Sequence, residues 1–265
     1  MAADTLPVLT GVLRDQRRPL VLWCLALAAV SAMYIAFYPA IGPSAMDDMI
    51  ASMPDDLVAA MGYDRIGSPA GYITSTVYGL LGPILLLVFA ISTGARLIAG
   101  EEEDGTLELE LTSPVERRRI FAERLAALWF DVLLLVATLT VVSAGLVAAL
   151  DIDVGFTLLL AGSAGMYLLG IGMGTVAMGI GAITGRRALA LGVAAALAVL
   201  SFILDAIGPV VDAGWMTAVS PFSWYLAHDP LINGFDVTGL LLLAAIPIVF
   251  AVAGLTRFGR RDLMV

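Results

Sequence analysis

Long apolar runs, separated by short polar segments, dominate the sequence. Each run is about as long as the ~20 residues that a helix needs to cross a hydrocarbon core of ~30 Å. The pattern predicts six transmembrane helices, at about residues 20–38, 72–98, 120–150, 156–184, 188–207 and 237–255. Because these runs leave no stretch for a separate soluble domain, we expect one all-α, polytopic membrane domain over residues 1–265.

An amphipathic segment precedes the first span. Its apolar residues recur at roughly helical spacing over residues 6–13, and three arginines follow them, as in a helix that lies at a membrane surface. Pro19 comes next, and proline suits the first position of a new helix. We therefore expect an interfacial helix over about residues 5–18, separate from the first span.

Composition and charge agree with a membrane protein and suggest its orientation. Of the 265 residues, 60% are hydrophobic and 14% are charged, which lies outside the balance of soluble domains. The 14 basic residues are all arginine, and apart from Arg65 they gather before the first span, around residues 96–124, at residues 186–187 and near the C-terminus. Because excess arginine marks cytoplasmic loops, we expect a multi-pass protein of the plasma membrane with both termini in the cytoplasm. The net charge of −9 excludes nucleic-acid binding.

The outer segment at residues 39–71 is rich in proline and methionine. Met46, Met49 and Met53 recur at helical spacing beside acidic residues, so we expect two short amphipathic helices in this segment. Methionine thioethers are also soft ligands that suit Cu(I). Packing is the usual role of methionine at such spacing, and copper binding stays open as the alternative.

The sequence lacks the motifs of common catalytic and nucleotide sites. A Walker A loop needs a lysine that reaches the phosphates, and this chain has no lysine. The one histidine, His228, has no GxSxG motif to accompany it. The GMGTVA stretch at residues 172–177 resembles a dinucleotide fingerprint, but glycines such as Gly170 and Gly174 let helices approach closely in lipid. We expect no catalytic residue, cofactor or metal in this chain.

Two acidic residues, Asp131 and Asp205, lie within predicted spans. An ionisable residue inside a membrane is costly and often functional, so both are candidates for a substrate path. Asp131 lies seven positions after Arg124, which is about 10 Å along a helix, and Asp205 is close to the outer end of the fifth span. Placement near the membrane boundary is therefore the alternative explanation for both.

The longest polar insertion between two apolar runs is GEEEDGTLELELTSPVERRRIFAER, residues 100–124. Residues 113–116, Ser-Pro-Val-Glu, fit a capping box with proline at the first helical position. The box separates a short helix, roughly residues 101–111, from the start of the third span. The first turn of that span carries three arginines, Arg117, Arg118 and Arg119. Anchoring to lipid phosphates accounts for the arginines, and the acidic helix before them is placed to dock onto a soluble partner.

This insertion resembles the segment between the second and third spans of type-2 ABC transporter permeases. The family pattern is E-x-x-x-G-T-L-E-x-L-x-x-x-P-x-x-R. The matching residues are Glu101, Gly105, Thr106, Leu107, Glu108, Leu111, Pro114 and Arg117, with Leu111 one position later than the commonest spacing. The six-span layout and the outer segment before the last span resemble that family across nearly the whole chain.

The resemblance implies that the chain is the membrane subunit of an ABC exporter. Residues 100–113 would hold the coupling helix, which docks into a cleft of a separate ABC ATPase subunit. The residues implied in this coupling are Glu101, Glu102, Gly105, Thr106, Leu107, Glu108 and Leu111. Two permeases, as a homodimer in the lipid bilayer, would assemble with two ATPases, and those ATPases would bind ATP and Mg. Arg124 stands where family members often have lysine, so the charge is kept.

We expect the complex to export a drug-like amphiphile, an antibiotic or a lipid. One alternative is a permease of a copper-enzyme maturation system, which the methionine-rich outer segment would suit. A secondary transporter that works without ATP is another, and it predicts charges deep in several spans and an internal repeat, neither of which is evident. An intramembrane enzyme is a third alternative and lacks a constellation of catalytic residues.

Overall fold

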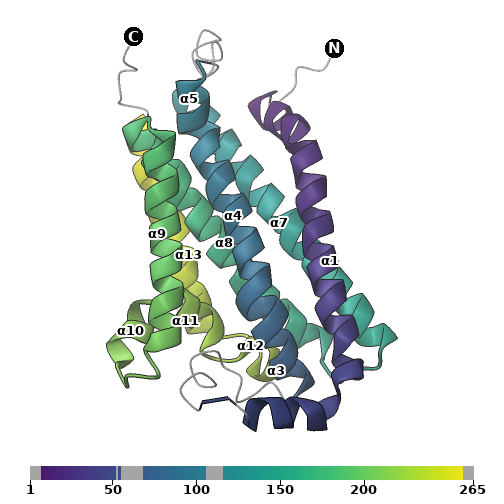
Figure 1. Cartoon of the computed structure of the whole chain (residues 1–265). Coiled ribbons are helices and arrows are strands. Elements are labelled where there is room, and N and C mark those ends of the chain that lie inside the picture. The colour runs from purple at the N-terminus through teal and green to yellow at the C-terminus, as the bar shows by residue number, and fades with distance from the viewer. Residues whose placement is uncertain (1–6, 52, 55–67, 106–115, 259–265) are drawn as a thin grey trace.

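A computed structural model of the chain describes residues 7–51, 53–54, 68–105 and 116–258. Over these residues the secondary structure is entirely helical, and the long helices form one up-and-down bundle (Figure 1). Six stretches are long and apolar enough to cross a membrane: Val8–Pro39, Pro69–Glu103, Arg117–Ala149, Phe156–Thr184, Arg187–Ile207 and Val237–Phe258. The predicted all-α membrane fold with six spans is therefore confirmed.

The first helix, α1, spans Pro7–Ala51 without interruption. The helix boundary expected at Pro19 is not found, because α1 packs along α7, Arg117–Ala149, and this contact begins at its first turn. Residues 7–18 are thus the start of α1 and not a separate helix. α1 also runs through Pro39, where the outer segment was expected to begin, and it changes direction towards its C-terminal end (Figure 1), as prolines inside a helix favour.

The expected pair of short outer helices is only partly described. The first expected helix is the C-terminal end of α1, and the second, around residues 57–61, lies outside the described residues. The side chains of Met46 and Met49 also lie outside them, so copper binding stays an alternative that the structure does not address.

The second span is one helical column with two π-helical stretches. Its parts are α3 (Pro69–Ile73), η2 (Thr74–Leu81), α4 (Gly82–Ala95), η3 (Arg96–Gly100) and α5 (Glu101–Glu103). Ser68 caps the start of the column, because its hydroxyl accepts a hydrogen bond from the Gly71 amide at 3.0 Å. Glu101 therefore lies in the last turn of the second span and does not open the new helix that was expected from the sequence.

The remaining spans agree closely with the predicted ranges. They are α7, α8 (Phe156–Thr184), α9 (Arg187–Ile207) and α13 (Val237–Phe258). The bounds of α8 match the prediction at both ends, and Gly185 ends the helix with φ +65°, a conformation that glycine adopts readily. Glu116 does not lie within a helix, as the predicted capping box requires: it is extended, and its backbone carbonyl accepts hydrogen bonds from the amides of Arg119 and Ile120. The described part of α7 begins at Arg117, and residues 113–115 of the box lie outside the described residues.

Three short helices lie between α9 and α13, at the end of the bundle where α9 finishes (Figure 1). They are α10 (Gly214–Val219), α11 (Pro221–Leu226) and α12 (Pro230–Asn233). The Ser220 hydroxyl caps α11 by accepting from the Ser223 amide. Trp215 is exposed at this end, a placement typical of aromatic residues at a membrane interface.

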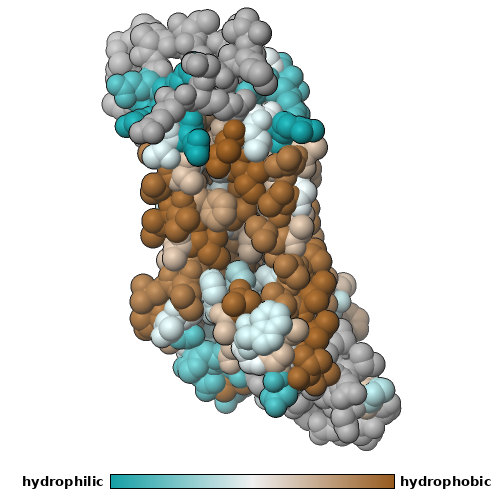
Figure 2. All heavy atoms as spheres, turned by 90° about the vertical axis from the view of Figure 1, so that its left-hand side faces the viewer, coloured by the Kyte–Doolittle hydropathy of each residue, from teal (hydrophilic) through white to brown (hydrophobic). Residues whose placement is uncertain are grey.

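The outer surface of the bundle is an apolar belt between two polar ends. Figure 2 shows this belt on one face, with hydrophilic residues gathered above and below it. Large apolar side chains such as Leu22, Val141 and Val237 are more than half exposed in the single chain. A surface of this kind is stable in contact with lipid, since lipid tails are as apolar as the side chains.

The helix α8 is central, and it packs against α4, α7, α9 and α13. At its crossing with α4 the two backbones touch: a Cβ atom added to Gly94 would lie 2.1 Å from the Gly174 carbonyl oxygen. The close approach that the glycine spacing predicts is therefore found at Gly174. This contact fixes the position of the second span relative to the bundle core.

We predict that Gly94→Ala lowers the thermal stability of the full chain in lipid nanodiscs, because the added methyl group has to push α4 away from α8. Overpacking of this kind costs about 1–3 kcal/mol. Gly145→Ala in α7 is the matched control, since its Cβ would meet nothing within 4 Å. Equal melting temperatures for the two variants would contradict the backbone contact.

Candidate functional site

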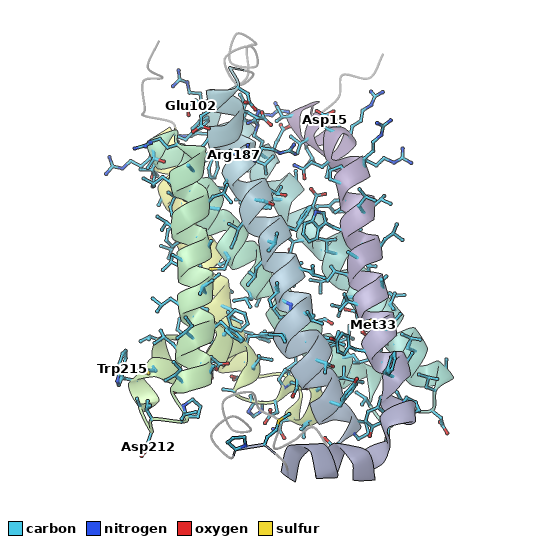
Figure 3. The ribbon with its side chains drawn as sticks, in the orientation of Figure 1. Asp15, Met33, Glu102, Arg187, Asp212 and Trp215 are labelled. Atoms are coloured by element: carbon cyan, nitrogen blue, oxygen red, sulfur yellow. The ribbon has the colours of Figure 1, made fainter. Side chains whose placement is uncertain are left out.

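The described arginine residues lie at one end of the bundle. α1 and α7 begin there, α9 begins there, and α5 and α13 end there (Figure 1). Figure 3 places Asp15, Glu102 and Arg187 at this end, while Asp212 and Trp215 lie at the opposite end. We call it the arginine-rich end, and it contains the described part of the predicted coupling segment.

The predicted coupling residues are only partly described. Glu101 and Glu102 form the last turn of the second span together with Glu103, and the column ends at Gly105, whose φ is +71°. A positive φ suits glycine and stops a helix. The other predicted coupling residues, Thr106, Leu107, Glu108 and Leu111, lie outside the described residues.

Arg124 joins the second span to the third. Its side chain has no exposed surface, and it donates hydrogen bonds to the Leu97 carbonyl and to the Glu101 carboxylate. In an α-helix the Glu101 amide would bond to the Leu97 carbonyl four positions back, but in η3 it bonds to the carbonyls of Arg96 and Ile98. Because the Glu101 amide bonds elsewhere in this π-helical stretch, the Leu97 carbonyl is left to accept from the Arg124 guanidinium.

Glu123 joins the third span to the first. Its Oε2 atom accepts hydrogen bonds from the backbone amides of Val8 and Leu9, both at 3.0 Å. Its Oε1 atom accepts from Arg119 Nε at 2.7 Å. A carboxylate at the first turn of a helix satisfies amides that have no partner within the helix and complements the helix dipole. Glu123 therefore holds the start of α1 against α7.

Glu103 joins the second span to the fifth. Its Oε1 atom accepts a hydrogen bond from the backbone amide of Arg187, the first residue of α9, at 2.9 Å. We name Glu101, Glu103 and Glu123, with the groups that donate to them, the acidic junction. Through it the last turn of the second span is bonded to α7 and α9, and α7 in turn is bonded to α1.

The three arginines of the predicted membrane anchor occupy the first turn of α7, as the sequence analysis expects. Arg118 and Arg119 are exposed and Arg117 is partly exposed. Arg119 has a protein partner in Glu123, which the sequence reasoning missed. A signal was present, because Arg119 and Glu123 are four positions apart, the spacing of neighbours on a helix.

The two candidates for a substrate path do not lie together. Asp131 belongs to α7 and is fully buried, and neither carboxyl oxygen has a hydrogen-bond partner in the described part of the chain. Asp205 belongs to α9, and its Oδ1 atom accepts from the Ser223 hydroxyl at 2.6 Å. The Ser223 bond gives Asp205 a structural role, because it ties α11 to α9.

A cluster of hydroxyl groups lies between η2, α7 and α8. The Ser163 hydroxyl contacts that of Tyr78 at 3.2 Å and that of Thr140 at 2.6 Å. Tyr225 of α11 donates to the Tyr78 carbonyl at 2.9 Å. Burial raises the pKa of the Tyr225 hydroxyl well above its usual range, and Tyr78 adds to the effect, so Tyr225 keeps the proton that it donates. Sequence reasoning missed this cluster, since hydroxyl residues in an apolar helix give no distinct pattern.

Comparison with known families decides the class of protein. A sequence model of the family described as ABC-2 family transporter protein matches residues 12–263, which is nearly the whole chain. The chain belongs to the ABC-2 transporter family. It is therefore a multi-pass membrane permease of an ABC transporter, a kind of subunit that is generally non-catalytic and that works in general with an ABC ATPase. A comparison with curated proteins gives no match.

We predict that Glu101→Ala destabilises the ABC-2 permease, because it leaves the buried Arg124 guanidinium with one partner fewer. Breaking a fully buried pair typically costs about 3–5 kcal/mol. The effect here should be smaller, since the Glu101 side chain is 26% exposed. Thermal unfolding in nanodiscs measures the change.

Asp104→Ala is the control for this prediction, because Asp104 is an exposed neighbour of the pair, and such surface changes stay within about 0.5 kcal/mol. The double variant Glu101→Leu/Arg124→Leu should recover much of the loss, since apolar residues tolerate the buried position. Equal destabilisation by Glu101→Ala and Asp104→Ala would contradict the role of the pair.

Proposed function

We propose that this ABC-2 permease couples ATP hydrolysis by a separate ABC ATPase to the export of an amphiphilic substrate. The observation that carries the proposal is the acidic junction, which includes Glu101, the first residue of the family's coupling motif. Membership of the family supports a partner ATPase in general, and the absence of lysine from the chain supports an ATP and Mg site on that partner.

The orientation follows from the charges. The arginine residues that the structure describes gather at one end of the bundle, and excess arginine marks the cytoplasmic side. This supports a plasma-membrane protein with its coupling segment and both termini in the cytoplasm. The ATPase would then meet the permease at residues 101–111.

The acidic junction supplies a route for the force of ATPase closure. A push on residues 101–111 reaches α7 through the Glu101–Arg124 pair and α9 through the bond from Glu103 to the Arg187 amide. The bonds from Glu123 to the first amides of α1 carry the movement of α7 to α1. Three spans would shift together and open or close a path at the interface with a second permease, as helices move at an interface in known switches.

We predict that Leu107→Ala and Leu111→Ala each weaken association with the ATPase encoded beside the permease. A leucine buried at an interface contributes about 1.5–3 kcal/mol, so affinity should fall about tenfold or more. Co-purification followed by titration of the ATPase onto the permease measures this. Asp153→Ala, exposed in the turn after α7, is the control, and an unchanged affinity in both leucine variants would overturn the docking site.

A junction variant separates docking from coupling in the same assay. Glu103→Ala leaves residues 106–111 intact but removes the acceptor of the Arg187 amide, so the ATPase should bind with unchanged affinity while substrate-stimulated hydrolysis falls. Full stimulation in Glu103→Ala would show that force does not pass through the junction.

We further expect two permeases and two ATPases in each complex, as the family resemblance implies. Native mass spectrometry of the complex released from nanodiscs gives the stoichiometry directly. A complex with one permease and one ATPase, or with two different permeases, would contradict the homodimer.

A further inference from the structure

Three arginine side chains on the outer face of α1 have no partner in the described part of the protein. They are Arg14, Arg17 and Arg18, and all three are exposed. None of them forms an ion pair or a side-chain hydrogen bond with a residue that the structure describes. Arg119 and Arg124, by contrast, are paired within the acidic junction. The guanidinium groups of the α1 arginines are therefore available to a ligand from outside the chain.

The local charge favours an anionic ligand. Residues 14–18 contain three arginines and one aspartate, Asp15, which leaves a net charge of +2. Asp15 is exposed as well, and it forms no ion pair with the arginines beside it. Arg14 and Arg18 are four positions apart, a spacing at which like charges on a helix repel each other. A bound anion would remove this repulsion.

The same face of α1 becomes apolar immediately after the arginines. Leu22 and Leu25 follow Arg18 by four and seven positions, so they lie on the same face of the helix as Arg14 and Arg18. Both leucine side chains are more than half exposed. A phospholipid has the same order of groups, a charged phosphate followed by an apolar chain.

The contact between α1 and α7 gives the height of the arginines in the bundle. The amides of Val8 and Leu9 bond to Glu123, and both helices begin at the arginine-rich end (Figure 1). Arg14 and Arg18 lie six and ten residues after Val8. They are therefore about 9–15 Å from this contact, in the direction of the opposite end of the bundle.

At the same height the outer face of α7 is already apolar. Phe130 and Leu133 lie seven and ten residues after Glu123, which is about 10–15 Å along α7. They are the exposed residues of α7 between positions 129 and 133. The α1 arginines therefore lie at the height where the bundle begins to contact lipid, and a charged group at that depth needs a partner or a path back to water.

The direction of the arginine side chains suits a lipid headgroup. Side chains on a helix lean towards its N-terminus, which for α1 is the arginine-rich end. The apolar stems can then lie along the helix while the guanidinium groups reach back to the membrane surface. A guanidinium group binds a phosphate through two parallel hydrogen bonds. The lipid phosphate is the anion that membranes supply at this height.

We propose that the outer face of α1 binds an anionic phospholipid in the leaflet at the arginine-rich end. The guanidinium groups of Arg14, Arg17 and Arg18 bind the phosphate headgroup, and an acyl chain lies along Leu22 and Leu25. A zwitterionic lipid fits less well, because the net positive charge of residues 14–18 repels its cationic group. The site is formed by one chain, so it holds or fails independently of the ATPase.

The position of the arginines favours a lipid over the ATPase as the occupant. The predicted coupling segment begins near Glu101, which is bonded to Arg124 in the acidic junction. Arg14 and Arg18 lie about 9–15 Å from the junction contact at Glu123, on the membrane side of it. A protein docked at the coupling segment would have to reach into the headgroup layer to contact them.

Native mass spectrometry of the full chain in detergent, titrated with phosphatidylglycerol, tests the site. Arg14→Gln/Arg18→Gln should lower the affinity for the first bound lipid about tenfold or more, because each arginine adds to the attraction for an anionic headgroup. Arg186→Gln/Arg257→Gln is the matched control, since it removes two exposed arginines from the same end of the bundle, and it should leave that affinity unchanged. Equal affinities of the two double variants would rule out the site.

Two further ligands identify the occupant. Phosphatidylcholine with the same acyl chains should bind the wild type more weakly than phosphatidylglycerol, and equal binding would contradict the preference for an anionic lipid. Glycerol phosphate, a soluble headgroup, should fail to displace phosphatidylglycerol at an equal concentration, because it has no chain to cover Leu22 and Leu25. Displacement would show that the ligand is a soluble phosphate and that the lipid assignment is wrong.

A titration with the ATPase encoded beside the permease separates the lipid from the protein partner. Arg14→Gln/Arg18→Gln should bind the ATPase with the affinity of the wild type. Reduced affinity for the ATPase together with unchanged binding of phosphatidylglycerol would assign these arginines to the ATPase instead.

Thermal unfolding gives a readout that does not depend on mass spectrometry. A lipid that binds only the folded chain raises its melting temperature, so phosphatidylglycerol added to phosphatidylcholine nanodiscs should raise that of the wild type by about 2–4 °C. The control variant should show the same rise. Arg14→Gln/Arg18→Gln should match the wild type in phosphatidylcholine alone, because both changes are on the surface, and should gain less from phosphatidylglycerol. A full gain in this variant would show that the lipid binds elsewhere.

Discussion

A guanidinium group without exposed surface is stable inside an apolar bundle only where acceptors surround it. In Arg124, Nη1 donates to the backbone carbonyl of Leu97 and Nη2 donates to the carboxylate of Glu101. The end of the second span and the start of the third are held together by this need for acceptors. The π-helical stretch η3 belongs to the same arrangement, because it redirects the Glu101 amide away from the Leu97 carbonyl. The acidic junction extends it to α9 and α1.

The second span is held at a second point, and the two points differ in kind. Near its middle, Gly94 lies against the backbone of α8 at Gly174, a contact of close packing that tolerates little sliding. At its end, Glu101 and Glu103 form hydrogen bonds that water molecules can replace. A displacement at the arginine-rich end would therefore pivot about the glycine contact, and the hydroxyl cluster around Tyr78 lies on the far side of that pivot.

Hydrophobic run length predicted the six spans, and it predicted the bounds of α8 closely because Gly155 and Gly185 interrupt the helix at both ends. It could not predict that α1 continues through Pro19, since that depends on packing against α7. It also could not predict the acidic junction, because Glu123 and Val8 are 115 positions apart and periodicity gives the face of a helix but not its neighbour. Glu101 is predicted as a docking residue, and the structure shows that it also contacts Arg124 inside the bundle.

The length of α1 has a mechanical consequence. Its 45 residues extend over ~68 Å as a straight helix, while the hydrocarbon core of a membrane is only ~30 Å thick. α1 is therefore longer than a membrane core is thick, and its C-terminal end turns across the end of the bundle instead of continuing along it (Figure 1). One continuous helix thus runs from the acidic junction to the opposite end of the bundle, so its first turn and its far end belong to a single element.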